Sequence, residues 1–231
     1  MRFFIGLFLL TTARASAMEV SASVPVFFIE ASRSRFVVDS PEMRAAFTPE
    51  GVVFQAPAGQ VRIRFGGASS RVEVRGARPM GHANFLIGSD PGAWRTELPV
   101  FREILYRQLY PGIEAAYAGA GGHLKSEFRV SPGADPRQIR LEYSEDLSID
   151  SAGWLHAGNL REQAPRIYQD TAAGRVSVNG RYRLLDSRTA GFEIQVYDPG
   201  LPLVIDPVIS YATYMGGTGA GAVTGLAIDT A

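Results

Sequence analysis

The sequence predicts an all-β protein, a β-sandwich-like domain of antiparallel strands, and two observations support this prediction. Apolar and charged residues alternate over short stretches such as residues 61–65 and 71–75, and a period of two is the period of a half-buried strand. The chain also holds 25 glycines and 14 prolines, which supply turns between such stretches. Strands that recur roughly every eight to twelve residues between turn signals are typical of a sandwich or a barrel-like domain.

The first half of the chain contains four clear candidate strands, at residues 24–29, 51–54, 61–65 and 71–75. Only the glycine-rich stretch 66–70 separates the last two, so we predict that they form a hairpin. Residues 101–110 have apolar positions that fit both helical and strand spacing. We predict a strand there that runs into a turn at Pro111, because proline ends either element.

The second half alternates more clearly and predicts three hairpins, 147–149 with 154–155, 167–170 with 175–178, and 182–185 with 192–197. Gly153 lies in the first of these turns and is free to take a positive φ. Single strands are expected at residues 127–130 and 139–143. Residues 203–205 are continuously apolar, so we expect this strand to be central in a sheet.

The N-terminus predicts a signal peptide over residues 1–17. Arg2 gives a positive start, residues 3–10 form an apolar core, and Ala15 and Ala17 are the small side chains that signal peptidase accepts. We expect cleavage after Ala17. A core of this length is too short to cross roughly 30 Å of hydrocarbon as a helix, and no other stretch is long enough. The mature chain is therefore expected to have no membrane span and to be secreted or held at the cell envelope.

The composition argues against several kinds of chemistry. The chain has no cysteine, which removes disulfides, thiolate zinc sites and cysteine nucleophiles. Its 23 basic and 23 acidic residues give a formal charge of zero, so there is no general basic field for nucleic acid. No dinucleotide-binding glycine pattern, P-loop or Gly-x-Ser-x-Gly elbow is present. We predict no cofactor and no nucleic-acid partner.

Seven short sequence motifs follow one another along the chain, at residues 84–99, 110–114, 130–136, 165–169, 192–198, 203–207 and 210–217. In this order they resemble the N-terminal domain of bacterial SBBP-type β-propeller repeat proteins, a domain with no established activity. The resemblance covers roughly residue 62 to the end. Glu114 stands where that family usually has Asp, and residues 124–128 replace a more acidic pattern, which argues against a shared ion-binding role.

The last residues carry the second half of the resemblance. Residues 211–219 and Asp229 with its neighbours are similar to the opening of an SBBP repeat. We therefore expect three parts: a signal peptide (1–17), a β-sandwich-like domain (18–207) and the start of a truncated, incomplete β-propeller repeat (208–231). One repeat cannot bury its own apolar face, so the expected partners are downstream propeller repeats. The alternative interpretation is a self-contained protein whose last residues form a flexible tail.

Carboxylates and histidines offer only weak catalytic candidates. Two carboxylates about 5 to 10 Å apart can hydrolyse a glycosidic bond, and the acids in the most motif-like parts are Glu114, Glu127, Asp135 and Asp206. The last two precede prolines, which suits turn capping better than catalysis. The histidines, His82, His123 and His156, have no metal-ligand spacing. We predict no catalytic residue and no metal site.

Aromatic residues are the only candidate ligand contacts. Trp94 and Trp154 could stack on a sugar, although such residues more often fill a β core. Tyr110 and Tyr168 are expected in the core or at corners, with their hydroxyls bonded to backbone.

The function expected from this sequence is a non-catalytic, exported structural or interaction module that precedes a β-propeller at the cell envelope or outside the cell. The first alternative is a carbohydrate-binding or adhesion module, with a glycan or a surface protein as partner. The second is a secreted glycoside hydrolase-type enzyme.

Overall fold

Strands make up almost all of the regular structure. The computed structural model describes residues 26–40, 43–56, 59–86, 88–120 and 123–211. Within these ranges the chain forms 19 strands and two single-turn 3-10 helices, η1 (Pro91–Ala93) and η2 (Pro136–Gln138). All strand pairings between them are antiparallel. The predicted all-β, antiparallel class is confirmed, and the described residues include no helix that could span a membrane.

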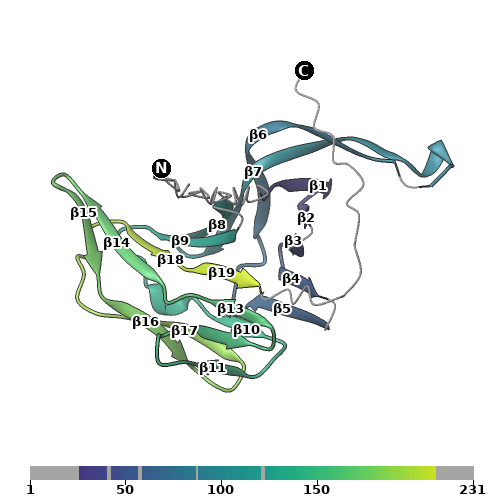
Figure 1. Ribbon diagram of the computed structural model, residues 1–231. Coiled ribbons are helices and arrows are strands. Elements are labelled where there is room, and N and C mark those ends of the chain that lie inside the picture. Colours follow the sequence, from purple (N-terminus) through teal and green to yellow (C-terminus); the bar gives the residue numbers. More distant parts are fainter. Residues whose placement is uncertain (1–25, 41–42, 57–58, 87, 121–122, 212–231) are drawn as a thin grey trace, which may run out of the picture.

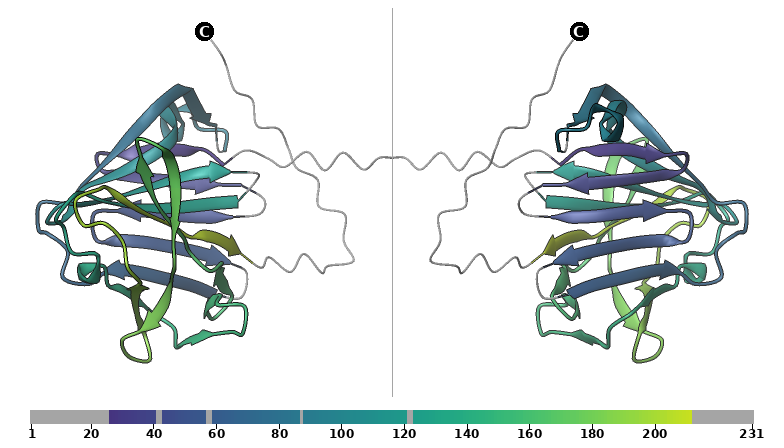
Figure 2. Two further views of the ribbon diagram at one scale, coloured as in Figure 1. Left: turned by 90° about the vertical axis from the view of Figure 1, so that its left-hand side faces the viewer. Right: turned by 90° about the vertical axis from the view of Figure 1, so that its right-hand side faces the viewer.

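The first five strands form a meander in which each strand pairs with the next: β1 (Phe28–Ser32), β2 (Arg35–Asp39), β3 (Arg44–Thr48), β4 (Gly51–Ala56) and β5 (Gly59–Phe65). Figure 2 shows these strands stacked side by side. Their inward positions carry large apolar side chains that are fully buried, among them Phe28, Phe36, Phe47 and Phe54. The alternate positions therefore face outwards.

A long hairpin follows, made of β6 (Glu73–Phe85) and β7 (Arg95–Tyr110), and its base continues into β8 (Ile113–Ala120) and β9 (His123–Val130). The distal half of the hairpin, residues 80–86 and 88–99, projects beyond the rest of the sheet and is here called the arm (Figure 1). Pairing along the hairpin shifts between Pro79 and Gly81, next to Arg78, whose φ is 57°. Such bulges bend a strand pair.

The free edge of β9 carries two strands in line, β18 (Leu203–Asp206) and β19 (Val208–Tyr211), which Pro207 separates. β18 pairs further with β14 (Arg166–Thr171), and β14 with β15 (Gly174–Val178). β19 pairs further with β13 (Leu160–Glu162), which leads to β12 (Leu155–Ala157) and β11 (Leu147–Ile149). The predicted central position of residues 203–205 is confirmed.

The other end of the sheet curls round to meet β11. β5 pairs with β10 (Leu141–Tyr143), β10 with β17 (Thr189–Ile194), and β17 with β16 (Gly180–Leu184). The backbone N–H groups of Tyr143 and Leu147 donate to the carbonyls of Arg188 and Ser187, both at 2.8 Å. The strands thus form one sheet that is nearly closed into a barrel, with the aromatic core inside.

The barrel interior also holds one buried carboxylate. The hydroxyl of Tyr143 donates to Oε1 of Glu162 at 2.6 Å, and that of Tyr182 donates to Oε2 at 2.9 Å. Burial raises the pKa of Glu162, and the two hydroxyl donors act against this rise. A buried polar group needs such partners to be tolerated.

Three of the four predicted hairpins are confirmed, as β11–β12, β14–β15 and β16–β17. Gly153 takes a φ of 80° in the first of these turns, and β7 ends at Tyr110 before the predicted turn. The predicted hairpin of residues 61–65 with 71–75 is wrong. β5 pairs with β4 and β10, whereas β6 pairs with β7, because alternation reveals the face of a strand but not its neighbour.

Candidate functional site

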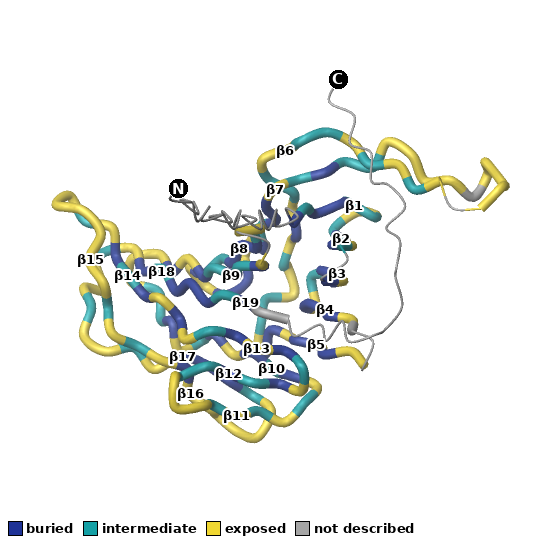
Figure 3. Tube along the Cα trace, in the orientation of Figure 1, coloured by how far each residue is buried: buried dark blue, intermediate teal, exposed yellow. Residues whose placement is uncertain are grey.

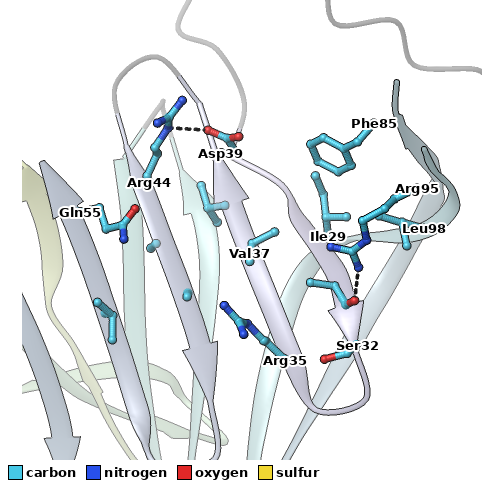
Figure 4. A pocket seen from close by; sticks show the side chains of 15 residues that line it. Ile29, Ser32, Arg35, Val37, Asp39, Arg44, Gln55, Phe85, Arg95 and Leu98 are labelled. Atoms are coloured by element: carbon cyan, nitrogen blue, oxygen red, sulfur yellow. Dashed lines mark hydrogen bonds and ion pairs between the residues drawn. The ribbon is translucent and has the colours of Figure 1, made fainter. Parts of the chain in front are cut away.

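A groove on the outside of the barrel is the best candidate site among the described residues. It lies over the outer face of β1–β4, has a volume of about 560 Å³, and is closed on one side by the arm (Figure 4). Figure 3 shows that the tip of the arm is exposed, whereas the strands beneath the groove consist mainly of buried and intermediate positions.

The floor of the groove is an apolar row that crosses four strands. Strand pairing places Ile29 opposite Val37, Val37 opposite Ala46, and Ala46 opposite Val53. These residues occupy the outward positions, where a sheet that faces water usually carries polar side chains. We call them the apolar row.

The arm forms the wall of the groove and is tied to the sheet. Phe85 of β6 and Leu98 of β7 line the groove beside Ile29. The guanidinium of Arg95 donates a hydrogen bond to the backbone carbonyl of Ala31 in β1. This bond joins the arm to the first strand of the meander and so fixes the width of the groove.

Arginines dominate the charge of the groove. Arg35, Arg44 and Arg95 line it together with one acid, Asp39, which gives these four side chains a formal charge of +2. Arg44 and Asp39 form an exposed ion pair with Nε–Oδ1 at 2.9 Å, whereas Arg35 makes no ion pair with any described residue. Since guanidinium groups bind carboxylates and phosphates in a bidentate manner, the groove suits an anionic ligand.

Each of the four acids named from the sequence is held in an ion pair. Each has a basic partner, at 3.0 Å for Glu114 with Arg107, 2.6 Å for Glu127 with Arg129, 2.9 Å for Asp135 with Arg137, and 2.7 Å for Asp206 with Lys125. Asp135 caps η2, as its position before a proline suggests, and its hydrogen bonds with Arg137 lower its pKa. A general acid needs a raised pKa instead.

Two further carboxylates were missed by sequence reasoning. Glu103 of β7 is buried and binds Arg129 at 2.9 Å and Arg78 at 3.3 Å, an arrangement that depends on strand pairing and has no sequence signal. Glu162 lies at an inward position of a short strand, so period-two alternation through Leu160 could have found it. Both carboxylates are occupied by donors, which is typical of structural groups.

The histidines lie apart. His156 of β12 pairs with Asp150 (Nε2–Oδ2 2.9 Å), His82 lies 3.9 Å from Glu97 in the arm, and His123 begins β9. The described parts of the chain hold no group of three His, Cys, Asp or Glu side chains that could bind a metal ion.

The two tryptophans also lie on separate elements. Trp94 is at the tip of the arm, 38% exposed, and its Nε1 donates to the carbonyl of Gly88 at 3.2 Å. Trp154 is half-buried in the turn before β12. They cannot act as one stacking platform, although Trp94 alone is accessible.

The predicted tyrosine contacts are confirmed for one residue of two. The hydroxyl of Tyr110 donates to the carbonyl of Arg140 at 3.2 Å and accepts from its N–H at 3.3 Å. Tyr168 differs, because it lies half-exposed on the outer face of β14. The guanidinium of Arg175 stacks 3.7 Å over its ring, so the alternation of β14 places it outside the core.

Comparison with known proteins identifies a family but no characterised relative. No curated protein and no solved structure matches the chain. A family model described as a domain of unknown function, DUF7948, matches residues 27–208. This range includes the groove, the arm and the barrel core, and it is more than half of the 231 residues. The chain therefore belongs to the DUF7948 family.

Proposed function

We propose that this domain is a non-catalytic, exported structural or interaction module that precedes a β-propeller of the SBBP type. The strand β19 is the observation that supports this proposal most directly. Val208–Tyr211 pairs with β9 on one side and β13 on the other, and residue 211 is also where the likeness to an SBBP repeat begins. The double pairing holds the C-terminal strand of the described chain against the barrel, at the point where the likeness to the repeat begins.

Such an attachment suits a domain that covers or presents a stack of blades. The first blade of a repeat array exposes a sheet edge that needs cover. A barrel that directly precedes the first repeat in the chain can shield that edge. The ion pairs on all four candidate carboxylates favour this role over hydrolysis, because a carboxylate held by a cation is a poor proton donor.

The genomic reading frame beyond codon 231 and an activity screen test this proposal together. We expect further Tyr-x-Thr-Tyr-x-Gly-Gly units downstream, and no turnover when the purified mature protein is incubated with a panel of polysaccharides. A hydrolysis that disappears in both Glu114→Gln and Glu127→Gln would contradict the proposal and favour the secreted glycosidase. A frame without such units would remove the propeller from the proposal.

A carbohydrate-binding or adhesion role is the second candidate, and the exposed Trp94 at the tip of the arm favours it. Glycan-array binding that is lost in Trp94→Ala but kept in Trp154→Ala would support it. Equal binding by both variants and the parent would remove the structural reason for this candidate.

A further inference from the structure

One face of the barrel carries arginines that no acid neutralises. Arg35, Arg62 and Arg64 are exposed and form no ion pair with any residue in the described ranges. Arg62 lies opposite Val53, so it extends the apolar row by one strand. Arg64 lies opposite Glu142 of β10, the only acid in that strand, but no ion pair joins the two side chains.

The opposite arrangement is found on the outer face of β7–β9. There Arg107, Lys125 and Arg129 each bind a carboxylate at between 2.6 and 3.0 Å. In a chain with equal numbers of acids and bases, one face is thus internally neutral and the other is left positive. An uncompensated positive face attracts anionic ligands.

The positive charges are arranged on both sides of the apolar row. Arg44, which is paired with Asp39, lies two residues from Ala46 along β3, on one side of the row. The unpaired Arg35 lies two residues from Val37 along β2, on the other side. Arg62 closes the far end of the row. Successive outward positions on a strand are about 6.7 Å apart. A glutamate or aspartate side chain of a ligand that lies on the row can therefore reach these arginines.

The row also has the spacing of an extended peptide. Its four residues lie on four neighbouring strands, so the row is about 14 Å long. Residues of the row that lie two strands apart, such as Ile29 and Ala46, are separated by about 9.6 Å. A polyproline II chain has three residues per turn and advances about 9.3 Å in each turn. One of its three faces can therefore follow the row, while the other two direct side chains towards the arginines on either side.

We propose that the groove binds an extended, acidic segment of a partner protein in which every third residue is apolar. Two successive apolar side chains, about 9.3 Å apart, lie on the row of Ile29, Val37, Ala46 and Val53, and the carboxylates bind the unpaired Arg35 and Arg62. A neutral sugar is a poorer match, because the row is aliphatic and sugars stack on aromatic faces. This inference takes from the proposed function only that the domain binds a partner.

The test uses the whole mature chain, residues 18–231, and a labelled nine-residue peptide, Asp-Val-Asp-Asp-Val-Asp-Asp-Val-Asp. Fluorescence anisotropy is recorded at low and at physiological salt. We expect binding that weakens with salt and that is about tenfold weaker in the double variant Arg35→Glu/Arg62→Glu. Arg183→Glu is the control for a charge reversal away from the groove, because Arg183 is an exposed arginine of β16 without an ion pair among the described residues, and this variant should bind as the parent does.

A second peptide separates this site from a general anion patch. Replacing the three valines by serines keeps every charge and removes the apolar contacts, and we expect binding about fivefold weaker. Equal binding of the two peptides would overturn the inference, and so would the absence of any binding. It would also be overturned if Arg183→Glu lost as much affinity for the peptide as the double variant does, or if polygalacturonate bound more tightly than the peptide. None of these results bears on the reading frame or the activity screen, so failure here is distinct from failure of the proposed function.

Discussion

The hydroxyl of Tyr143 lies 2.6 Å from Oε1 of Glu162 in the interior of the barrel. Tyr143 belongs to β10, which is on the meander side of the sheet, whereas Glu162 belongs to β13 on the β9 side. The bond therefore joins the two regions that meet where the barrel almost closes. Tyr182 of β16 completes the contact at 2.9 Å, so one carboxylate links three strands.

We predict that Glu162→Ala destabilises the protein by about 2–4 kcal/mol, because it leaves two buried hydroxyls without their acceptor. Urea unfolding followed by circular dichroism measures this. Glu193→Ala is the control, since Glu193 forms an exposed ion pair with Arg181, and such pairs contribute about 1 kcal/mol or less. Equal losses in the two variants would show that the buried contact does not stabilise the barrel.

Glu162 also predicts a pH dependence. Its pKa is raised by burial above the ordinary value of 4.5, so the folded chain holds the proton more tightly than the unfolded chain. The resulting contribution to stability is complete below about pH 4.5 and is lost as the pH rises through the raised pKa. The free energy of unfolding of the parent should therefore fall relative to Glu162→Gln between pH 4.5 and 7. Parallel curves for the two proteins would contradict the assignment.

The pair of Lys125 and Asp206 gives a third prediction. Nζ of Lys125 lies 2.7 Å from Oδ2 of Asp206, whose side chain is 9% exposed and whose Oδ1 has no hydrogen-bond partner within the described part of the chain. Lys125→Met leaves that carboxylate buried and unpaired, at an expected loss of about 3–5 kcal/mol. The double variant Lys125→Met/Asp206→Asn should recover most of it. Thermal unfolding of both variants checks this, and a double variant as unstable as the single one would refute it.

A fourth prediction concerns the turn between β3 and β4. Gly51 has a φ of 149°, and a Cβ there would lie 2.0 Å from the carbonyl oxygen of Ile63. Gly51→Ala must displace backbone, so we expect a loss of about 2–3 kcal/mol. Gly59→Ala is the matched control, since Gly59 has a φ of 137° but nothing within 4 Å of its added Cβ. Its loss of stability, measured by urea unfolding, should be smaller; a similar loss would contradict the clash.

Local pattern predicted the strands better than their partners. The three confirmed hairpins have short turns with glycine or aspartate, so one stretch of sequence contains both strands and the signal that joins them. β8 was missed because residues 115–120 are mostly alanine and glycine, which have low strand propensity. This strand forms because β7 and β9 pair with it on both sides.

The groove could not be predicted from the sequence, because it depends on register. Ile29, Val37, Ala46 and Val53 belong to four strands, and only their pairing brings them into one row. The arm that closes the groove comes from a later part of the chain, and its contact of Arg95 with Ala31 joins residues 64 positions apart. Alternation predicts that these residues face outwards, but not that they lie side by side.

Hydrogen exchange along β19, measured on a protein of residues 18–231, tests the central claim most directly. If β19 holds the end of the domain against the barrel, the amides of residues 208–211 should exchange as slowly as those of β9, to which β19 is paired. Exchange at the rate of an unpaired chain end would contradict the account, because β19 would then not be a fixed part of the barrel.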